Sequence, residues 1–306
     1  MRILVTGTGG LLGLNLALEL SRQHTVIGAD RKALLVKDAF EALQVDLSTP
    51  QAVSKLVEES QPEAIIHCAA LANIDACESD PVMASQMNAE LPGWIAAEAA
   101  RVGSQLVHIS TDSVFDGLEG GYTEDSPTNS LSVYSQTKLD GEGAVFAAMP
   151  EAVVTRVNLF GWSASGNRSL AEFFYHNLAA GKTVKGFTDV YFCPILVNDL
   201  ADVFIEIFQQ HLSGLYHLVS PVCMTKYTFG LAIAEKFGFD PEQIMPVSVN
   251  EFGLVAARSP LLTLKNEKLT QALGHALPDV HAGLERFYQL RQQGYPEKLA
   301  HMVLPG

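Results

Sequence analysis

A glycine-rich turn near the amino terminus constrains the fold more than any other feature of this chain. It joins a short apolar β run, Ile3–Thr6, to a helix-like segment, Leu11–Ser21. Gly7, Gly10 and Gly13 fit the spacing GxxGxxG, whereas the commoner GxGxxG needs a glycine at position 12, which is leucine. Such glycines permit a tight turn and let the backbone approach a pyrophosphate, while the helix presents free N–H groups to it. The predicted dinucleotide-binding turn comprises Gly7, Thr8, Gly10, Leu11, Leu12 and Gly13.

Strand-like and helix-like segments alternate through the first half of the chain. Repeated βα units predict an α/β fold: a Rossmann-like, doubly wound parallel sheet with helices on both faces. We expect residues 1–160 to form this NAD(P)-binding domain and residues 161–306 to form mainly a smaller substrate-binding lobe, with later segments completing the sheet. The expected strands are Ile3–Thr6, Thr25–Ala29, Ala64–His67, Gln105–Ser110, Ala152–Val157, Thr183–Gly186 and Gly214–Val219. The expected helices are Leu11–Ser21, Pro50–Ser60, Pro81–Arg101, Val133–Ala148, Ser169–Ala180, Asp199–Gln210, Lys226–Phe237 and Asp279–Gln293.

Composition argues against several classes of function. The 306 residues include 34 acids against 20 Lys and Arg, which gives a net charge of −14. This charge repels phosphate backbones and anionic lipids, so we expect neither nucleic-acid nor membrane binding. No apolar run approaches the roughly 18 residues of a membrane span. A buried strand and helix explain the apolar amino terminus better than a signal peptide does, because Arg2 is its only early charge. We therefore expect a cytoplasmic protein.

Cysteine and histidine usage points to neither a disulfide scaffold nor a metal site. The four cysteines, Cys68, Cys77, Cys193 and Cys223, are scattered and show no CxxC spacing. We predict that all four are reduced thiols. The nine histidines form no ligand-spaced cluster, so we expect no bound metal.

Charged residues after the second predicted strand bear on the choice of cofactor. Asp30 closes that strand, where an acid can accept hydrogen bonds from the adenosine ribose diol. Arg31 and Lys32 follow directly and can instead neutralise a 2′-phosphate, so the cofactor is NADH or NADPH. Asp46 and Leu47 follow a third short apolar segment, where they could face the adenine.

Tyr134 and Lys138 are four residues apart on a predicted helix and therefore share one face. A neighbouring ammonium favours the ionised form of a phenol and lowers its pKa, so such a tyrosine can pass a proton to or from a substrate oxygen. By itself this spacing is also typical of a solvated helix face.

Together these motifs resemble the extended short-chain dehydrogenase/reductase family over nearly the whole chain, and most closely its dTDP-4-dehydrorhamnose reductase group. The glycine turn, the STD triplet and YxxxK carry most of the resemblance, since their order and spacing are highly specific. The matching stretches are TGTGGLLG (6–13), HCAA (67–70), NIDACE (73–78), MNAELP (87–92), ISTDSVFDG (109–117), YSQTK (134–138), FCPILVNDLAD (192–202) and RSPLLTLKNEKL (258–269).

The resemblance implies roles for three catalytic residues. Thr111 matches the family's catalytic Ser/Thr, Tyr134 its proton donor, and Lys138 the partner that lowers the tyrosine pKa and holds the nicotinamide ribose. A hydride would leave NADPH or NADH for a ketone carbon while Tyr134 protonates the oxygen and Thr111 donates a hydrogen bond to it. The cofactor-side residues implied with Tyr134 and Lys138 are Cys68, Ala69 and Ala70.

One position separates this chain from related dehydratases. Sugar-nucleotide 4,6-dehydratases typically have STDE, and use the Asp-Glu pair for elimination. Here Thr111 and Asp112 are followed by Ser113, so the second acid is missing and dehydration is disfavoured. Ser135 is a second departure, because the family usually has glycine after the tyrosine.

Substrate contacts are expected along the same cleft. Core packing is at least as good an explanation for Trp162, and a surface charge is an alternative for Arg258. Asn88 could orient groups near the site or be a satisfied buried amide. The candidate substrate-binding residues are Thr111, Asp112, Ser113, Trp162, Asn167 and Arg258.

The resulting hypothesis is an NAD(P)H-dependent reductase of a nucleotide-linked 4-keto-6-deoxysugar. An epimerase or another ketone reductase on the same scaffold is the first alternative. The second is a non-catalytic NADP-binding regulatory subunit, since the beta subunit of methionine adenosyltransferase resembles the same group. The family also implies a possible homodimer.

Overall fold

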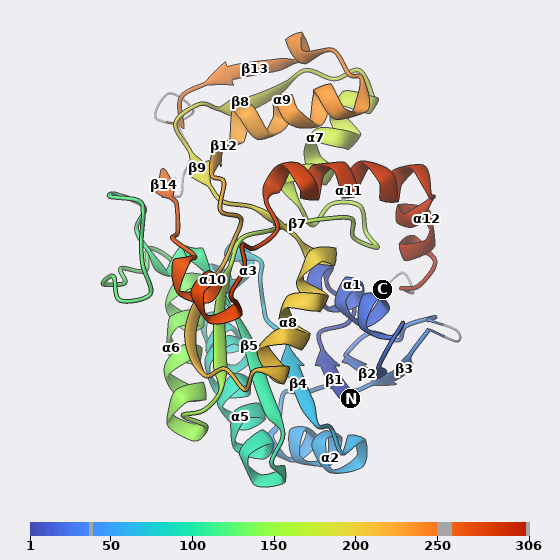
Figure 1. Cartoon of the computed structure of the whole chain (residues 1–306), viewed down its shortest axis with the longest axis vertical. Coiled ribbons are helices and arrows are strands. Elements are labelled where there is room, and N and C mark those ends of the chain that lie inside the picture. Colours follow the sequence, from blue (N-terminus) through green and yellow to red (C-terminus); the bar gives the residue numbers. More distant parts are fainter. Residues whose placement is uncertain (37–38, 250–258, 304–306) are drawn as a thin grey trace.

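Seven parallel strands form the central sheet of this protein, in the order β11-β6-β5-β4-β1-β2-β3. The computed structural model describes residues 1–36, 39–249 and 259–303 (Figure 1). The doubly wound parallel sheet predicted from the alternating segments is confirmed, and the late strand β11 completes one edge of it, beside β6. The strands of this sheet are β1 Arg2–Thr6, β2 Thr25–Asp30, β3 Glu41–Gln44, β4 Ala64–His67, β5 Gln105–Thr111, β6 Val153–Val157 and β11 Gly214–Leu218.

Helices cover both faces of the sheet, which is why its inner strands are apolar on both sides. On one face, α1 (Leu11–Leu20) and α8 (Leu200–Gln209) pack against the sheet in one hydrophobic cluster. On the other face, α2 (Pro50–Ser60), α5 (Leu91–Val102) and α6 (Val133–Ala148) bury a second cluster. Because the strands are parallel, their carboxyl ends share one edge, and the loops at that edge hold the glycine turn and Thr111.

The long helix expected over Pro81–Arg101 is divided into three parts. It consists of α4 (Pro81–Ser85), a π-helical turn (Gln86–Glu90) and α5. Pro92 has no N–H to donate to a carbonyl one turn earlier, and the wider turn accommodates this loss. The short α3 (Ile74–Ser79), which precedes these segments, was not expected.

A smaller lobe lies over the carboxyl edge of the sheet, with α7, α9, β8 and β13 at the top of Figure 1. Its core is aromatic and includes Phe174, Phe229 and Phe287, and it also includes Leu14 of α1. The lobe and the first half therefore share buried side chains. The remaining helices are α7 Leu170–Ala179, α9 Lys226–Phe237, α10 Glu267–Leu273, α11 Val280–Gln292 and α12 Tyr295–Ala300. The remaining strands are β7 Leu159–Phe160, β8 Val184–Phe187, β9 Tyr191–Phe192, β10 Ile195–Leu196, β12 Met224–Thr225, β13 Ile244–Val247 and β14 Leu261–Leu262.

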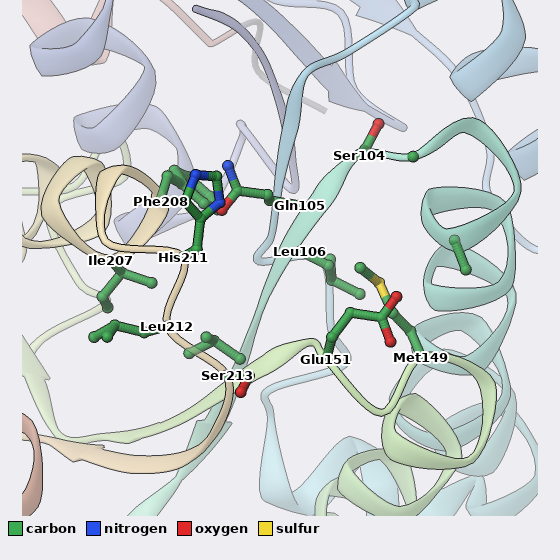
Figure 2. A pocket seen from close by; sticks show the side chains of 13 residues that line it. Ser104, Gln105, Leu106, Met149, Glu151, Ile207, Phe208, His211, Leu212 and Ser213 are labelled. Atoms are coloured by element: carbon green, nitrogen blue, oxygen red, sulfur yellow. The ribbon is translucent and has the colours of Figure 1, made fainter. Parts of the chain in front are cut away.

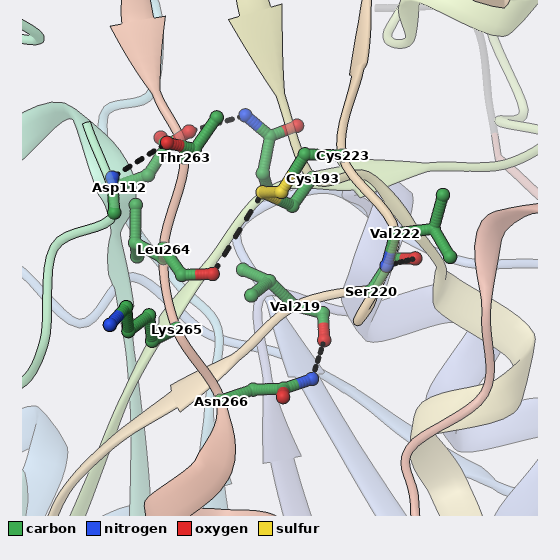
Figure 3. The surroundings of a disulfide bond; sticks show 12 residues. Asp112, Cys193, Val219, Ser220, Val222, Cys223, Thr263, Leu264, Lys265 and Asn266 are labelled. Carbon is green, nitrogen blue, oxygen red and sulfur yellow. Dashed lines mark hydrogen bonds between the residues drawn. A yellow bond between two sulfur atoms is a disulfide. The ribbon is translucent and has the colours of Figure 1, made fainter.

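The prediction that all four cysteines are unpaired is wrong, because a disulfide joins Cys193 to Cys223. Strands β9 and β12 pair antiparallel, and this register brings the two cysteines directly opposite each other, with Cα atoms 4.0 Å apart. Figure 3 shows the bond among Val219, Val222 and Leu264. The pairing depends on a strand contact between residues 30 positions apart, which cysteine spacing alone does not reveal. The other two cysteines are free.

Across the described ranges, no helix is both long and apolar enough to span a bilayer. The same ranges contain no group of three or more His, Cys, Asp or Glu side chains arranged to hold a metal ion.

Candidate active site

The glycine turn connects β1 to α1 in a conformation that requires glycine at two of its three spaced positions. Gly7 has φ +73°, and a Cβ there would lie 2.7 Å from the backbone nitrogen of Ala69. At Gly13 a Cβ would lie 2.3 Å from the Gly7 carbonyl oxygen, so this glycine lets α1 pack against the turn. Gly10 is exposed directly before the first residue of α1, where N–H groups are free to bind an anion.

The turn also contains an unpartnered polar atom. The side chain of Thr8 is fully buried, and its hydroxyl has no hydrogen-bond partner within the described residues. An open backbone cradle, a helix amino terminus and a spare hydroxyl suit the pyrophosphate of a dinucleotide. The residues present therefore fit NAD(P)H.

Asp30 lies at the end of β2, next to this turn. Its carboxylate accepts hydrogen bonds from the backbone N–H of Gly9 at 2.7 Å and of Lys32 at 2.9 Å. The Arg31 side chain is exposed beside it. Both the predicted ribose acceptor and the predicted 2′-phosphate partner thus flank the turn.

The other residues predicted on the cofactor side lie in less direct positions. Asp46 is exposed, and its side chain accepts a hydrogen bond from the Ser48 N–H. The side chain of Leu47 is buried in the cluster beneath α2, so it packs in the core instead of facing an adenine. Cys68, Ala69 and Ala70 follow β4 and are partly exposed at the carboxyl edge.

Helix α6 places Tyr134 and Lys138 one turn apart at its amino end. Ser132 and Ser135 form a reciprocal capping box, with each hydroxyl accepting the backbone N–H of the other residue at 3.1 Å. Ser135, which departs from the family's usual glycine, therefore fixes the start of the helix beside the tyrosine.

Thr111 ends β5 and faces Tyr134. Burial raises the pKa of Tyr134 to about 12, and a hydrogen bond with the Thr111 side chain opposes this rise. Tyr134 is nevertheless partly exposed. The tyrosine is therefore a neutral hydroxyl, which is the form that donates a proton.

Lys138 is buried, with 2% of its surface exposed. Its ammonium donates to the Ile109 carbonyl at 2.6 Å and lies 3.4 Å from His108 Nε2. Burial lowers the pKa of Lys138 to about 8. The expectation that this lysine lowers the tyrosine pKa is not met here, because burial dominates at Tyr134 and the ammonium is bound to β5.

Asp112 is buried next to Thr111. Its carboxylate accepts from the hydroxyls of Thr111 and Ser113 at 3.2 and 3.3 Å and from the side-chain amide of Asn158. Burial raises the pKa of Asp112, against these hydrogen bonds. Asn158 directly follows β6 and was missed in the sequence, where an isolated amide after a strand carries no distinctive signal.

Of the remaining predicted substrate contacts, two lie within the described residues, Trp162 and Asn167. Trp162 is fully buried in the lobe core, where it stacks on Phe287 with ring centroids 3.9 Å apart and donates Nε1–H to the Phe287 carbonyl. Its predicted substrate contact is therefore wrong, and core packing is its role. Asn167 is exposed and accepts from the Ser165 hydroxyl. Arg258 lies outside the described residues.

Two histidines near the site were also missed. His67 ends β4 and His108 lies in the middle of β5, with 1% of each exposed. No local pattern marks them, because their proximity depends on the register between β4 and β5. Asn88, in the π-helical turn, bonds the Leu71 backbone and the Thr137 hydroxyl, so it is a satisfied buried amide.

A separate cavity of about 260 Å³ lies at the opposite edge of the sheet (Figure 2). Gln105, Leu106 and Glu151 line it near the amino ends of β5 and β6. None of the predicted catalytic or cofactor-binding residues contributes to it, and ligands of parallel sheets bind at the carboxyl ends.

The RmlD substrate binding domain family matches residues 1–292 of this chain. The chain belongs to this family. The membership predicted from the glycine turn, STD and YxxxK is thereby confirmed.

Similar proteins of known name cover most of the chain. A probable low-salt glycan biosynthesis reductase of Haloferax volcanii is 32% identical over 93% of this chain and 96% of its own length. A dTDP-4-dehydrorhamnose reductase of Mycobacterium tuberculosis is 32% identical over 87% of this chain and 86% of its own. Methionine adenosyltransferase 2 subunit beta of Mus musculus is 34% identical over 81% and 75%.

Solved structures show the same fold. The dTDP-4-dehydrorhamnose reductase of Bacillus anthracis, solved in complex with NADP, superposes with a TM-score of 0.84. It is 26% identical and covers 94% of this chain and 98% of that one.

Proposed function

We propose that this protein is an NAD(P)H-dependent reductase of a nucleotide-linked 4-keto-6-deoxysugar, as in dTDP-4-dehydrorhamnose reduction. The contact between Thr111 and Tyr134, with Lys138 one turn further along α6, carries the proposal. This contact supplies a neutral proton donor and a second hydroxyl to the proposed site. The reductase relatives and the NADP complex support the same reaction class and cofactor.

The chain's own residues divide the work of such a reduction. NAD(P)H, when bound, supplies the hydride. Tyr134 donates its proton to the ketone oxygen as that oxygen gains charge, and Thr111 donates a hydrogen bond to the same atom. Lys138 holds a positive charge within the buried base of the site. The backbone at the glycine turn and the amino terminus of α1 orient the pyrophosphate.

The site offers little support for an elimination reaction. An elimination needs a second acid beside Asp112, and Ser113 instead donates its hydroxyl to that carboxylate. The raised pKa of Asp112 marks a buried, hydrogen-bonded group. We infer that Asp112, with Asn158, shapes the substrate side of the cleft.

The test is turnover of purified protein with a dTDP-4-keto-6-deoxysugar, measured as NADPH or NADH consumption. Tyr134→Phe removes the proton donor and is expected to lower kcat by about 10²–10⁴-fold. Cofactor affinity of this variant, measured by fluorescence titration, should stay near that of the wild type. Wild-type protein that binds NADPH tightly without turnover, and co-purifies with a larger enzyme, would favour the regulatory role named for the subunit beta relative.

We further propose a cytoplasmic location and a homodimer. The family resemblance supports both proposals. The molar mass of the purified protein, measured by light scattering, tests the dimer, because one chain has a mass of 33.1 kDa.

A further inference from the structure

A row of buried polar side chains crosses the sheet beneath Lys138. Thr6 on β1 pairs in register with His67 on β4, and His67 pairs with His108 on β5. Thr6 Oγ1 lies 2.7 Å from His67 Nδ1, and the two imidazole rings stack with centroids 5.2 Å apart. The row ends at the Lys138 ammonium, 3.4 Å from His108 Nε2. All four side chains are at most 2% exposed.

The Lys138 contact fixes where the proton lies on one of the two rings. An ammonium has donors only, so His108 Nε2 accepts from Lys138 and the ring carries its proton on Nδ1. Thr6 Oγ1 accepts the Ala69 N–H at 3.3 Å and also bonds His67 Nδ1, where either the hydroxyl or the ring can be the donor. His108 Nδ1 and His67 Nε2 have no partner among the described residues.

Among the described residues, the hydrogen-bond partners of the Lys138 ammonium are two neutral acceptors, the Ile109 carbonyl and His108. Glu142 follows one turn later on α6, but its carboxylate is already bound by Arg156, at 2.9 and 2.7 Å, and by Ser110 at 2.5 Å. The ammonium has three N–H groups, of which the Ile109 carbonyl and His108 take two. One N–H remains for a ligand at the floor of the cleft.

We propose that His108, backed by His67, is a positioning residue for the cofactor: its neutral imidazole holds the Lys138 ammonium so that one N–H faces the cofactor ribose. The idea rests on the proposed function only in requiring that NAD(P)H binds at the glycine turn. A carboxylate in place of His108 would bind the ammonium more strongly and draw it away from the ligand.

The same arrangement makes cofactor affinity depend on pH near neutrality. Lys138 has a pKa of about 8, so its charge is present below this pH and lost above it. The pKa values of Cys68 and Tyr134 are raised to about 12, and that of His67 is lowered to about 3. Burial and the Lys138 charge also hold the pKa of His108 well below its usual value. The titratable and charged groups around Lys138 come from β4, β5, β6 and α6. They are His67 on β4 and Cys68 just after it, His108 on β5 and Asp112 just after it, Tyr134 and Glu142 on α6, and Arg156 on β6.

NADPH affinity measured by fluorescence between about pH 7 and 9.5 tests the proposal. Wild-type affinity should weaken as the pH rises through the Lys138 pKa of about 8. This fall in affinity with rising pH is the alkaline limb of the profile. His108→Leu removes the acceptor, which destabilises the ammonium, so the alkaline limb should move to a pH about one unit lower. His108→Gln keeps an acceptor oxygen, and its limb should stay with that of the wild type. Lys138→Met should remove the limb altogether and so identifies its origin.

Folded His108→Leu protein with the wild-type limb would overturn the proposal, whatever its thermal stability. Should that variant not fold, ¹⁵N spectra of histidine-labelled wild-type protein decide, because they distinguish the two imidazole tautomers. His108 with its proton on Nδ1 supports the proposal, and a proton on Nε2 overturns it. Neither readout uses the sugar substrate, so failure of the proposed reaction would be seen separately, as absent turnover with normal NADPH binding.

Discussion

The choice between NADPH and NADH depends on single side chains beside the glycine turn. Arg31 is exposed next to Asp30, whose carboxylate is held by backbone N–H groups. A guanidinium can pair with a 2′-phosphate, and such charge-assisted bonds contribute about 1.5–3 kcal/mol. Arg31→Ala should therefore lower the ratio of kcat/KM for NADPH over NADH by about tenfold or more.

Lys32→Ala is the matched control for this ratio, because Lys32 is also exposed and only its backbone N–H bonds Asp30. Its ratio should stay near that of the wild type. An unchanged ratio in Arg31→Ala would show that another group reads the 2′ position.

For single residues, the sequence predicted chemical roles better than it predicted which side chains are buried. Thr111, Tyr134 and Lys138 were expected together because their roles require it, and the structure brings them to one edge. Trp162 was offered for the substrate, yet an aromatic ring after a strand can serve a core or a pocket equally well. The row from Thr6 to His108 went unnoticed because it exists only once the strand register is known.

At the scale of elements, a buried ion pair ties α6 to β6. Arg156 and Glu142 are bound by two hydrogen bonds, and their side chains are 4% and 6% exposed. Removing one partner leaves an uncompensated buried charge, which typically costs about 3–5 kcal/mol. Arg156→Leu should lower the free energy of unfolding by this amount, measured by chemical denaturation.

The double variant Glu142→Leu with Arg156→Leu is the control, since removing both charges leaves nothing unpaired. We expect it to recover at least half of the lost stability. A single variant as stable as the wild type would mean that the pair does not hold α6 in place.

Most long elements were predictable, and the short ones were not. The limits of α2, β4, α6 and α9 agree with the expected segments, because apolar periodicity and capping residues such as Thr49 before Pro50 mark them. The two-residue strands β9, β12 and β14 pair across distant parts of the chain. No local pattern marks such pairing, and the disulfide between Cys193 and Cys223 was missed for the same reason.

For the molecule as a whole, the sequence predicts the division into two regions more readily than it predicts the core that they share. The shift from regular βα units to shorter elements near residue 160 suggests a second lobe. Leu14 of α1 packs in the same cluster as Phe174, Phe229 and Phe287 of the lobe. The disulfide and β14 lie between the two regions. We therefore propose that the two regions unfold together.

This union predicts one cooperative thermal transition that responds to cofactor. A ligand that binds only the folded state stabilises it by RT ln(1 + [L]/Kd), or about 2.7 kcal/mol at 100 times Kd. NADPH at 100 times Kd should therefore raise the single Tm, measured by calorimetry, by roughly 4 °C. Gly10→Ala is the control: its φ of −89° suits alanine and its Cβ would approach only the Gly7 oxygen, at 3.1 Å, but the methyl occupies the surface that the pyrophosphate needs. This variant should lose the NADPH response, and its own Tm without NADPH is the reference because the Cβ crowds the Gly7 oxygen. Two transitions, only one of them shifted by NADPH, would instead show that the lobe unfolds independently despite the shared core.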